Sequence, residues 1–137
     1  MRVVIDTNIL VSFAIRHNAN FERLFDRIAE HGVSLICNDT ILELFTVLNR
    51  DKFRRYISPV MIVDYVEWYS AISERVITVE PITACRDPAD DKFLALAVSG
   101  NADCIIAGDK DLLDMTEFRG IPIYRVTDFL QHLDEKN

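Results

Sequence analysis

Four acidic side chains lie at points where a buried strand would end or a helix would begin. Asp6 directly follows a short apolar run, and Asp109 comes three residues after another such run. Glu43 and Asp91 fall in the first turns of segments with a helical apolar pattern. Helices that follow parallel strands begin at the carboxyl edge of the sheet, so these four carboxylates are expected to converge on one rim.

Carboxylates that lie close together raise one another's pKa unless cations neutralise them. A set of oxygen ligands without histidine or cysteine suits Mg²⁺ or Mn²⁺. Two such ions, about 3.5–4 Å apart, can hold a phosphodiester, activate a water and stabilise the departing oxygen. The sequence therefore predicts a magnesium or manganese site whose chemistry is phosphodiester hydrolysis.

Purely structural roles are open for the first two acids. Asp6 could cap a helix that begins near Asn8, although Thr7 and Asn8 could do so equally well. Glu43 lies three residues after Thr40, which is the spacing of a capping box.

Structural roles are also open for the later acids. Asp90 and Asp91 could serve only to favour the positive end of a helix dipole. Asp109 or Asp111 could be a turn residue or the N-cap of a short helix. Such roles explain each acid singly, but they do not explain why all of them fall on one rim of the sheet.

The elements that would position these acids alternate between strands and helices. Strands are expected at residues 3–5, 33–37, 104–106 and 121–124, with a short strand or extended connection at 76–79. Helices are expected over residues 9–15 and 21–28 with a stop at Gly32, and further helices open at Asn38-Asp39-Thr40, Ser58-Pro59, Asp87-Pro88 and Thr127-Asp128. Pro122 places its strand at the sheet edge. This alternation predicts an α/β fold, a three-layer α/β/α sandwich with a mostly parallel central sheet of four to five strands.

The composition is that of one folded domain, taken as residues 1–137. Half of the residues are apolar and 27% are charged, which excludes a disordered chain. No apolar run is long enough to span a membrane, and the amino-terminal one is too short for a signal peptide. Cys37, Cys85 and Cys104 lie far apart, which argues against a disulfide framework or a zinc site. We therefore expect a cytoplasmic protein.

The net charge of −7 disfavours a broad basic surface for nucleic acid, but it allows an acidic site that meets a polyanion through divalent cations. His17, His31 and His132 are scattered and are interpreted as surface or structural residues, with no Ser-His-Asp or Cys-His arrangement. No glycine-rich nucleotide loop is present, so no nucleotide cofactor is expected.

Three blocks of the sequence resemble those of PIN-domain ribonucleases. They are DTNIL at residues 6–10, DPADDKFLALA at 87–97, and the pair at 102–103 followed by GDKDLL at 108–113. In this order and spacing they are a specific signal that spans essentially the whole chain. The sequence is most similar to the VapC-like toxins of prokaryotic toxin–antitoxin pairs.

The resemblance implies that Asp6, Glu43, Asp91 and Asp109 are the catalytic, metal-binding acids, with Asp111 as a possible fifth ligand. It also implies a PIN-like fold, Mg²⁺ or Mn²⁺ as cofactor, and endonucleolytic cleavage of RNA. A cognate antitoxin would hold the activity in check, and the toxin would be a homodimer. The antitoxin's carboxyl-terminal segment would enter the acidic groove, where its Arg or Lys could displace the metals.

Periodicity does not choose between Asp90 and Asp91. The family's spacing, an acid followed three and four residues later by an apolar residue and an alanine, selects Asp91 through Leu94 and Ala95. Many relatives have a Ser or Thr just before the last acid, where this chain has Gly108. The resemblance also implies that two polar residues support the first carboxylate by hydrogen bonds within the turn. These are Thr7 and Asn8.

Five basic residues could contact RNA. They are Lys52, Arg54, Arg55, Arg86 and Lys92. The first three alternate with Phe53 and Tyr56, which could stack on a base, although the favoured interpretation of the segment is a solvated helix end with both aromatic rings in the core. The other two flank the acids at 87–91, where they could touch phosphate or balance Asp90.

Two other functions fit the sequence less well. A non-catalytic PIN-like interaction module would not need all four acids. A Mg²⁺-dependent phosphoryl-transfer domain would need an acid pair or D-x-D at the end of the first strand, where Asp6 is followed by Thr7 and Asn8.

Overall fold

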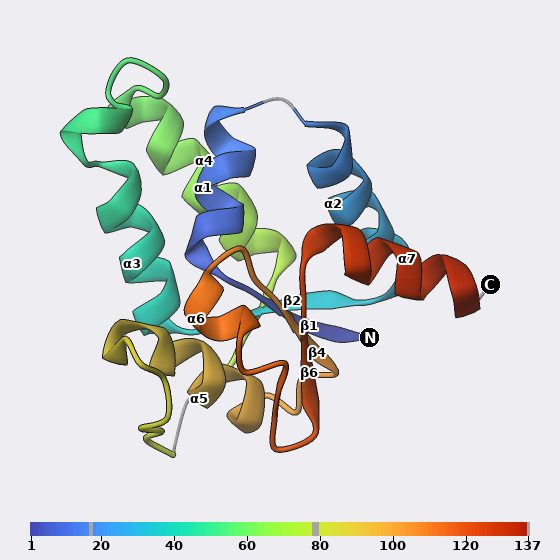
Figure 1. Ribbon diagram of the computed structural model, residues 1–137. Helices are drawn as coiled ribbons and strands as arrows, with labels where there is room; N and C mark the ends of the chain where they lie inside the picture. The colour runs from blue at the N-terminus through green and yellow to red at the C-terminus, as the bar shows by residue number, and fades with distance from the viewer. Residues whose placement is uncertain (17, 78–79, 137) are drawn as a thin grey trace.

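Six strands form one sheet at the centre of the molecule (Figure 1). The computed structural model describes residues 1–16, 18–77 and 80–136. The strands are β1 (Arg2–Ile5), β2 (Val33–Ile36), β3 (Glu74–Arg75), β4 (Cys104–Ile106), β5 (Glu117–Phe118) and β6 (Ile121–Tyr124). Their order is β3-β2-β1-β4-β6-β5, and every neighbouring pair is parallel except β5 and β6. The predicted mostly parallel sheet is confirmed, with six strands in place of four to five.

Helices connect the strands and cover both faces of the sheet. They are α1 (Thr7–Ile15), α2 (Ala19–His31), α3 (Asn38–Leu48), α4 (Pro59–Ile72), α5 (Asp91–Ser99), α6 (Lys110–Leu113) and α7 (Val126–Lys136), with 3-10 turns η1 (Asp51–Phe53) and η2 (Pro88–Asp90). Of the helices made of described residues, none has the length and apolar character needed to cross a membrane.

Alternating side chains of the strands divide the core into two layers. Val3 and Ile5 pack with apolar residues of α1, α2, α3, α4 and α7. Val4, between them, packs with α5 and α6 on the opposite face. Side chains of a strand point alternately to the two faces of its sheet, so this division follows from the strand itself. The three-layer α/β/α architecture is confirmed.

A pair of hydroxyl groups lies inside the layer formed by α4. The Tyr69 hydroxyl is 2.5 Å from the Ser34 Oγ of β2, and both residues are buried. Burial raises the pKa of Tyr69 to about 12, although the contact with Ser34 lowers it. The two groups satisfy each other where water has no access.

Three local predictions differ from the structure. A short strand or an extended connection was predicted at 76–79, and the strand β3 lies just before this segment, while residues 78 and 79 lie outside the described residues. Pro122 is in β6, which β5 covers, so its strand is not the sheet edge. The proline is tolerated because β6 uses the amide of the next residue, Ile123, to bond the Thr116 carbonyl. The last helix begins at Val126, one residue before the predicted cap.

Histidines and cysteines are in places compatible with structural roles. The His132 ring stacks on Tyr124 with centroids 5.4 Å apart. Half-exposed His31 ends α2 and lies beside Glu30, whereas His17 lies outside the described residues. The cysteines form no disulfide.

The strand order reverses between β1 and β4. From β1 the chain builds outward through β2 to β3, and it then returns to the other side of β1 to add β4 and β6. The loops that follow β1 and β4 therefore leave the sheet side by side at its carboxyl edge. In open α/β sheets this is the place where ligands bind.

Candidate active site

Asp6 joins the two loops at the carboxyl edge of the sheet. Its Oδ1 accepts a hydrogen bond of 2.9 Å from the amide of Ile9, which makes Asp6 the N-cap of α1. Its Oδ2 accepts from the amides of Gly108 and Asp109, at 2.9 and 3.2 Å, in the loop after β4. The residue therefore caps a helix, as one interpretation predicted, and also ties together segments that are far apart in sequence.

Burial has a large effect on Asp6. The residue is 2% exposed, and burial raises the pKa of its carboxyl to about 6, although the amides of Ile9, Gly108 and Asp109 lower it. The nearby charge of Asp109 adds to the rise. A cation at this edge of the sheet would favour the ionised form.

Thr7 and Asn8 follow Asp6 and line the same small cavity. The hydrogen bonds that reach Asp6 come from backbone amides of Ile9, Gly108 and Asp109. The resemblance assigned the hydrogen bonds that support the Asp6 carboxylate within the turn to Thr7 and Asn8. In the structure the donor within the turn is the amide of Ile9, and the loop after β4 supplies the other two donors.

A second group of carboxylates lies beside Asp6. Asp90, Asp109 and Asp111 each place one oxygen within 4.8 Å of the others. Asp109 is the N-cap residue of α6, and Asp90 is the last residue of η2. The Oδ2 of Asp90 is buried and has no hydrogen-bond partner among the described atoms.

The charge of this group is unbalanced. Burial raises the pKa of Asp90 to about 8, and its contact with Asp109 and the charges of Asp109, Asp87 and Asp6 add to the rise. A proton on Asp90 near neutral pH relieves the repulsion, and a divalent cation would do the same. All donors are oxygen atoms, which is the set that Mg²⁺ or Mn²⁺ prefers.

Glu43 approaches from α3. The helix begins at Asn38, and its capping box joins Cys37 with Thr40, so the capping box predicted for Thr40 and Glu43 is wrong. Glu43 lies nearly one turn further along, where its Oε2 is 2.9 Å from the Nζ of Lys92. It lines a cavity of about 30 Å³, close to the volume of a water or a small ion. The other lining residues are Asp6, Thr7, Asn8, Asp90, Phe93 and Asp109.

Asp91 does not lie in this group, although convergence with the other acids was predicted for it. Its Oδ1 accepts hydrogen bonds from the amides of Cys85 and Ala84, at 2.8 and 3.1 Å. These bonds hold the pKa of Asp91 below its usual range. Adjacent residues at a helix start point about 100° apart, so only one of Asp90 and Asp91 can face the cavity. The structure places Asp90 there.

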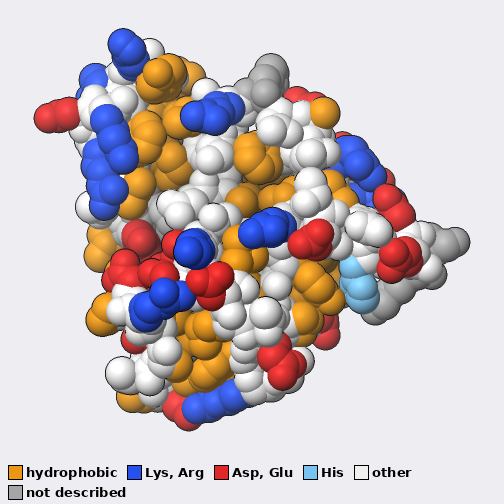
Figure 2. All heavy atoms as spheres, in the orientation of Figure 1, with side chains coloured by type: hydrophobic (Ala, Val, Ile, Leu, Met, Phe, Trp, Pro, Cys, Tyr) orange, Lys and Arg blue, Asp and Glu red, His pale blue; other side chains and the backbone are white. Residues whose placement is uncertain are grey.

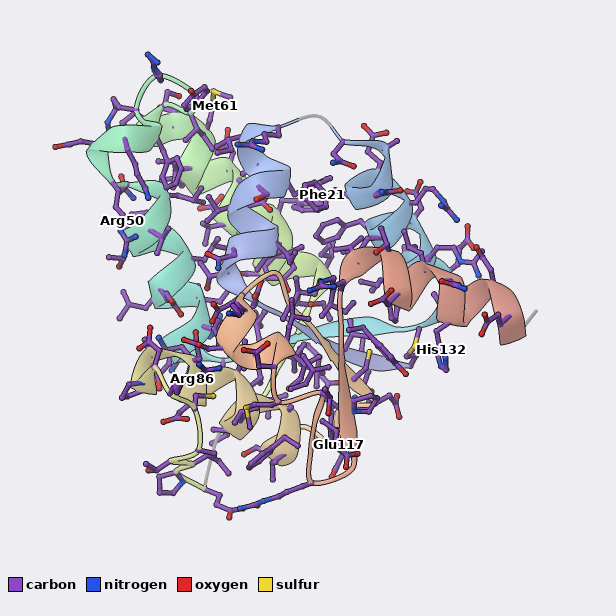
Figure 3. All side chains as sticks on the ribbon, viewed as in Figure 1. Phe21, Arg50, Met61, Arg86, Glu117 and His132 are labelled. Atoms are coloured by element: carbon purple, nitrogen blue, oxygen red, sulfur yellow. The ribbon has the colours of Figure 1, made fainter. Side chains whose placement is uncertain are left out.

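The two basic residues that flank this block are paired with acids. The guanidinium of Arg86 lies 2.8 Å from Asp114 and 3.4 Å from Asp111, both in or next to α6 (Figure 3). Lys92 is paired with Glu43. Both residues therefore balance carboxylates of the site itself, and the acid that Lys92 balances is Glu43.

Comparison with known proteins identifies the group to which this arrangement belongs. Residues 2–111 match the PIN domain family. An uncharacterized protein from Methanocaldococcus jannaschii is 30% identical over 119 residues, which cover 85% of this chain and 76% of that protein. The chain therefore belongs to the PIN domain family.

Solved structures share the fold at low sequence identity. VapBC2 from Rickettsia felis, bound to a DNA fragment from its promoter, is similar with a TM-score of 0.65 at 11% identity over 91% of this chain and 98% of that chain. FitAcB from Neisseria gonorrhoeae has a TM-score of 0.56 at 15% identity, over 91% and 98%. VapC20 from Mycobacterium tuberculosis, a toxin that cleaves the sarcin-ricin loop, has a TM-score of 0.54 at 15% identity, over 88% and 98%. The predicted PIN-like fold is confirmed.

Proposed function

We propose that this protein is a divalent-metal-dependent endoribonuclease and the toxin of a toxin–antitoxin pair. The observation that carries the proposal is the meeting of Asp90, Asp109 and Asp111 within 4.8 Å, next to Asp6 and Glu43 at the strand-order reversal. The buried Oδ2 of Asp90, which lacks a partner among the described atoms, is the kind of atom that a cation satisfies. Membership of the PIN domain family supports the nuclease class.

We assign Asp90, Asp109 and Asp111 as metal ligands, with Asp6 and Glu43 completing the acidic site. In this assignment Asp90 is the metal ligand, whereas the family's spacing to Leu94 and Ala95 had selected Asp91 for that role. Asp91 is a positioning residue, because its carboxylate fixes the backbone of residues 84–85 against the start of α5.

A bound Mg²⁺ or Mn²⁺ supplies a Lewis acid that lowers the pKa of a water and draws charge from the phosphate. The protein's own residues hold the site in shape. Asp6 fixes the loop that carries Asp109, and Lys92 neutralises Glu43. If Glu43 served as a metal ligand, the ammonium of Lys92 would be available to a phosphate oxygen.

Cleavage assays test the proposal directly. The purified protein should cut single-stranded RNA with Mg²⁺ or Mn²⁺ and stop when EDTA is added. Asp90→Asn and Asp109→Asn should each lower the cleavage rate by at least about a hundredfold, while Asp91→Asn should retain more activity than either. An Asp90→Asn variant that cuts RNA as fast as the wild type would overturn the assignment.

An antitoxin partner and a homodimer complete the proposal. The structural neighbours VapBC2 and FitAcB support a protein partner of this kind. The genome should carry a small open reading frame next to this gene, and co-expression of the two should yield a complex with reduced cleavage. Sedimentation of the isolated chain should give twice the monomer mass. We propose the cytoplasm as the place of action, because that is where the RNA substrate and the antitoxin would be made.

The structure gives no advantage to the other two functions. A phosphoryl-transfer domain needs an accessible nucleophilic carboxylate, whereas both oxygens of Asp6 accept backbone hydrogen bonds in a 2% exposed side chain. A non-catalytic module would show no rise in melting temperature with Mg²⁺ or Mn²⁺.

A further inference from the structure

Positive side chains without carboxylate partners gather at the connection between α3 and α4. Arg50, Lys52, Arg54 and Arg55 fall within six residues, and no ion pair joins any of them to an acid among the residues that the structure describes. Elsewhere, the cations that pair with carboxylates are Arg2, Arg23, Arg27, Arg86, Lys92 and Arg119. An acidic protein thus leaves a dense group of positive charges unneutralised at this connection.

This connection borders a shallow, wide-open hollow of about 550 Å³. Its lining consists of Asp51, Lys52, Arg54, Arg55 and Tyr56. Tyr56 is 55% exposed, so the prediction that both aromatic rings of this segment enter the core is wrong for Tyr56, whereas Phe53 does pack against the core. The guanidinium carbon of Arg55 lies 5.6 Å from the Tyr56 ring centroid. Cations beside a half-exposed aromatic ring are the features that hold the phosphates and stack the bases of a single nucleic-acid strand.

Helix α3 connects this hollow to the acidic site. Glu43 lies five residues before the end of the helix at Leu48, which corresponds to about 8 Å along the axis, and the segment 50–56 follows that end. In Figure 2 the acidic side chains gather where α3, α5 and α6 meet, and Lys and Arg side chains gather at the far end of α3 on the same face. Figure 3 shows Arg50 on the outer side of this end of α3. A single strand held at the acids can therefore continue along α3 to the hollow.

We propose that residues 50–56 form an RNA-binding subsite outside the metal site, where Lys52, Arg54 and Arg55 hold phosphates and Tyr56 stacks on a base. The subsite deepens the proposed function, since it names how the same substrate is held away from the cut. An acidic protein segment would satisfy the charges, but it would leave the exposed ring face of Tyr56 without a flat partner. RNA uses both features.

Binding measured in EDTA tests the subsite without cleavage. The probe is a fluorescein-labelled oligouridylate of about twelve nucleotides, within the usual range for single-strand sites. The triple variant Lys52→Gln, Arg54→Gln, Arg55→Gln should bind it at least about tenfold more weakly, and the slope of log affinity against log salt should fall by about 2. The matched control Arg23→Gln, Arg119→Gln, Arg125→Gln removes the same charge elsewhere and should change affinity less than twofold.

The ring has its own test. Tyr56→Leu should weaken binding about fivefold or more with an unchanged salt slope, and Tyr56→Phe should restore it. Equal affinity of the triple variant and the wild type overturns the subsite, as does an equal loss in the control. If polyglutamate displaces the probe as effectively as unlabelled oligouridylate does, the RNA-binding subsite is also overturned. The surface is then assigned to an acidic protein. Failure of Tyr56→Leu to weaken binding overturns the stacking role.

These outcomes are separable from those of the nuclease test. If the wild type cuts RNA and the triple variant cuts it with the same KM, the subsite is wrong while the nuclease stands. If the predicted residues bind RNA in EDTA but no metal induces cutting, the subsite stands while the nuclease is wrong.

Discussion

The ammonium of Lys92 lies 2.9 Å from Oε2 of Glu43, and this contact joins the first turn of α5 to α3 inside the acidic site. Both side chains are 24% exposed, so water screens the pair only partly. Together with Arg86, which lies beside Asp111, Lys92 is thus a cation of the protein's own in a place where carboxylates converge. A metal ion that uses Glu43 must displace it.

Removal of this resident cation should strengthen metal binding. Lys92→Gln should bind Mn²⁺ about two- to fivefold more tightly than the wild type, because Glu43 no longer has a competing partner. Titration of free Mn²⁺ by electron paramagnetic resonance measures the change. Lys110→Gln removes the same charge from α6 without breaking the pair, and an equal effect in this control would show that general electrostatics, not the Glu43 contact, is responsible.

Substitutions of Asp90 and Asp91 should have different effects on the stability of the protein and on its stabilisation by Mg²⁺. Asp91→Ala removes the acceptor for the amides of Ala84 and Cys85 and should lower the free energy of unfolding by about 1–3 kcal/mol. Asp90→Asn removes a carboxylate with an unpartnered oxygen, so it should not lower the melting temperature in EDTA. Melting curves with and without Mg²⁺ should show that Asp90→Asn loses the stabilisation by metal while Asp91→Asn keeps it. The reverse pattern would restore Asp91 as the ligand.

The metal-free protein should lose stability as the pH rises from about 4 to about 8. The pKa of Asp6 is raised from 3.8 to about 6 and that of Asp90 to about 8, so the folded state holds protons that the unfolded chain releases. Where the folded state binds more protons, the free energy of unfolding falls with pH. The pKa of Asp91 is lowered, so its contribution to the free energy of unfolding has the opposite dependence on pH. That contribution changes only below pH 3.8, the ordinary pKa of the carboxyl.

Urea denaturation in EDTA at several pH values measures this dependence. In Asp90→Asn the unfolding free energy should fall with pH only below about pH 6, because only Asp6 then contributes. In the wild type, Mg²⁺ should make the fall of unfolding free energy with pH smaller. A free energy of unfolding that rises through this window would contradict the assigned burial of the two carboxyls.

The hydroxyl pair in the core should behave as a coupled unit. Tyr69→Phe leaves the buried Ser34 Oγ without its partner and should cost about 1–2 kcal/mol of unfolding free energy. Ser34→Ala should cost a similar amount. The double variant should cost less than the two single costs combined, because no polar group is then left unpaired. Additive costs would show that the contact contributes nothing.

The positions of acidic residues after the expected strands predicted where much of the acidic site lies. Asp6 and Asp109 follow β1 and β4, and parallel strands bring such positions to one edge whatever the rest of the chain does. Glu43 was predicted from its place near the start of the helix after β2. That helix begins at Asn38, within the predicted opening Asn38-Asp39-Thr40, but its cap was not predictable, because cysteine is an uncommon N-cap residue.

The choice between Asp90 and Asp91 depends on contacts that no local pattern encodes. The amides that capture Asp91 belong to residues 84–85, in an irregular segment before η2. Their position is a result of tertiary packing, so spacing within α5 alone could not reveal it. The two-residue strand β5 was missed for a similar reason, since a strand of that length has no detectable period.

The two-sided bonding of Asp6 bears on how an inert form of the protein should be made. Replacing Asp6 by alanine would silence the site and also release three amides that hold two loops together. Loss of function at that position would then report misfolding as readily as lost chemistry. For trapping uncut substrate, or for expression in a host that the active protein would harm, a change at Asp90 is the safer choice.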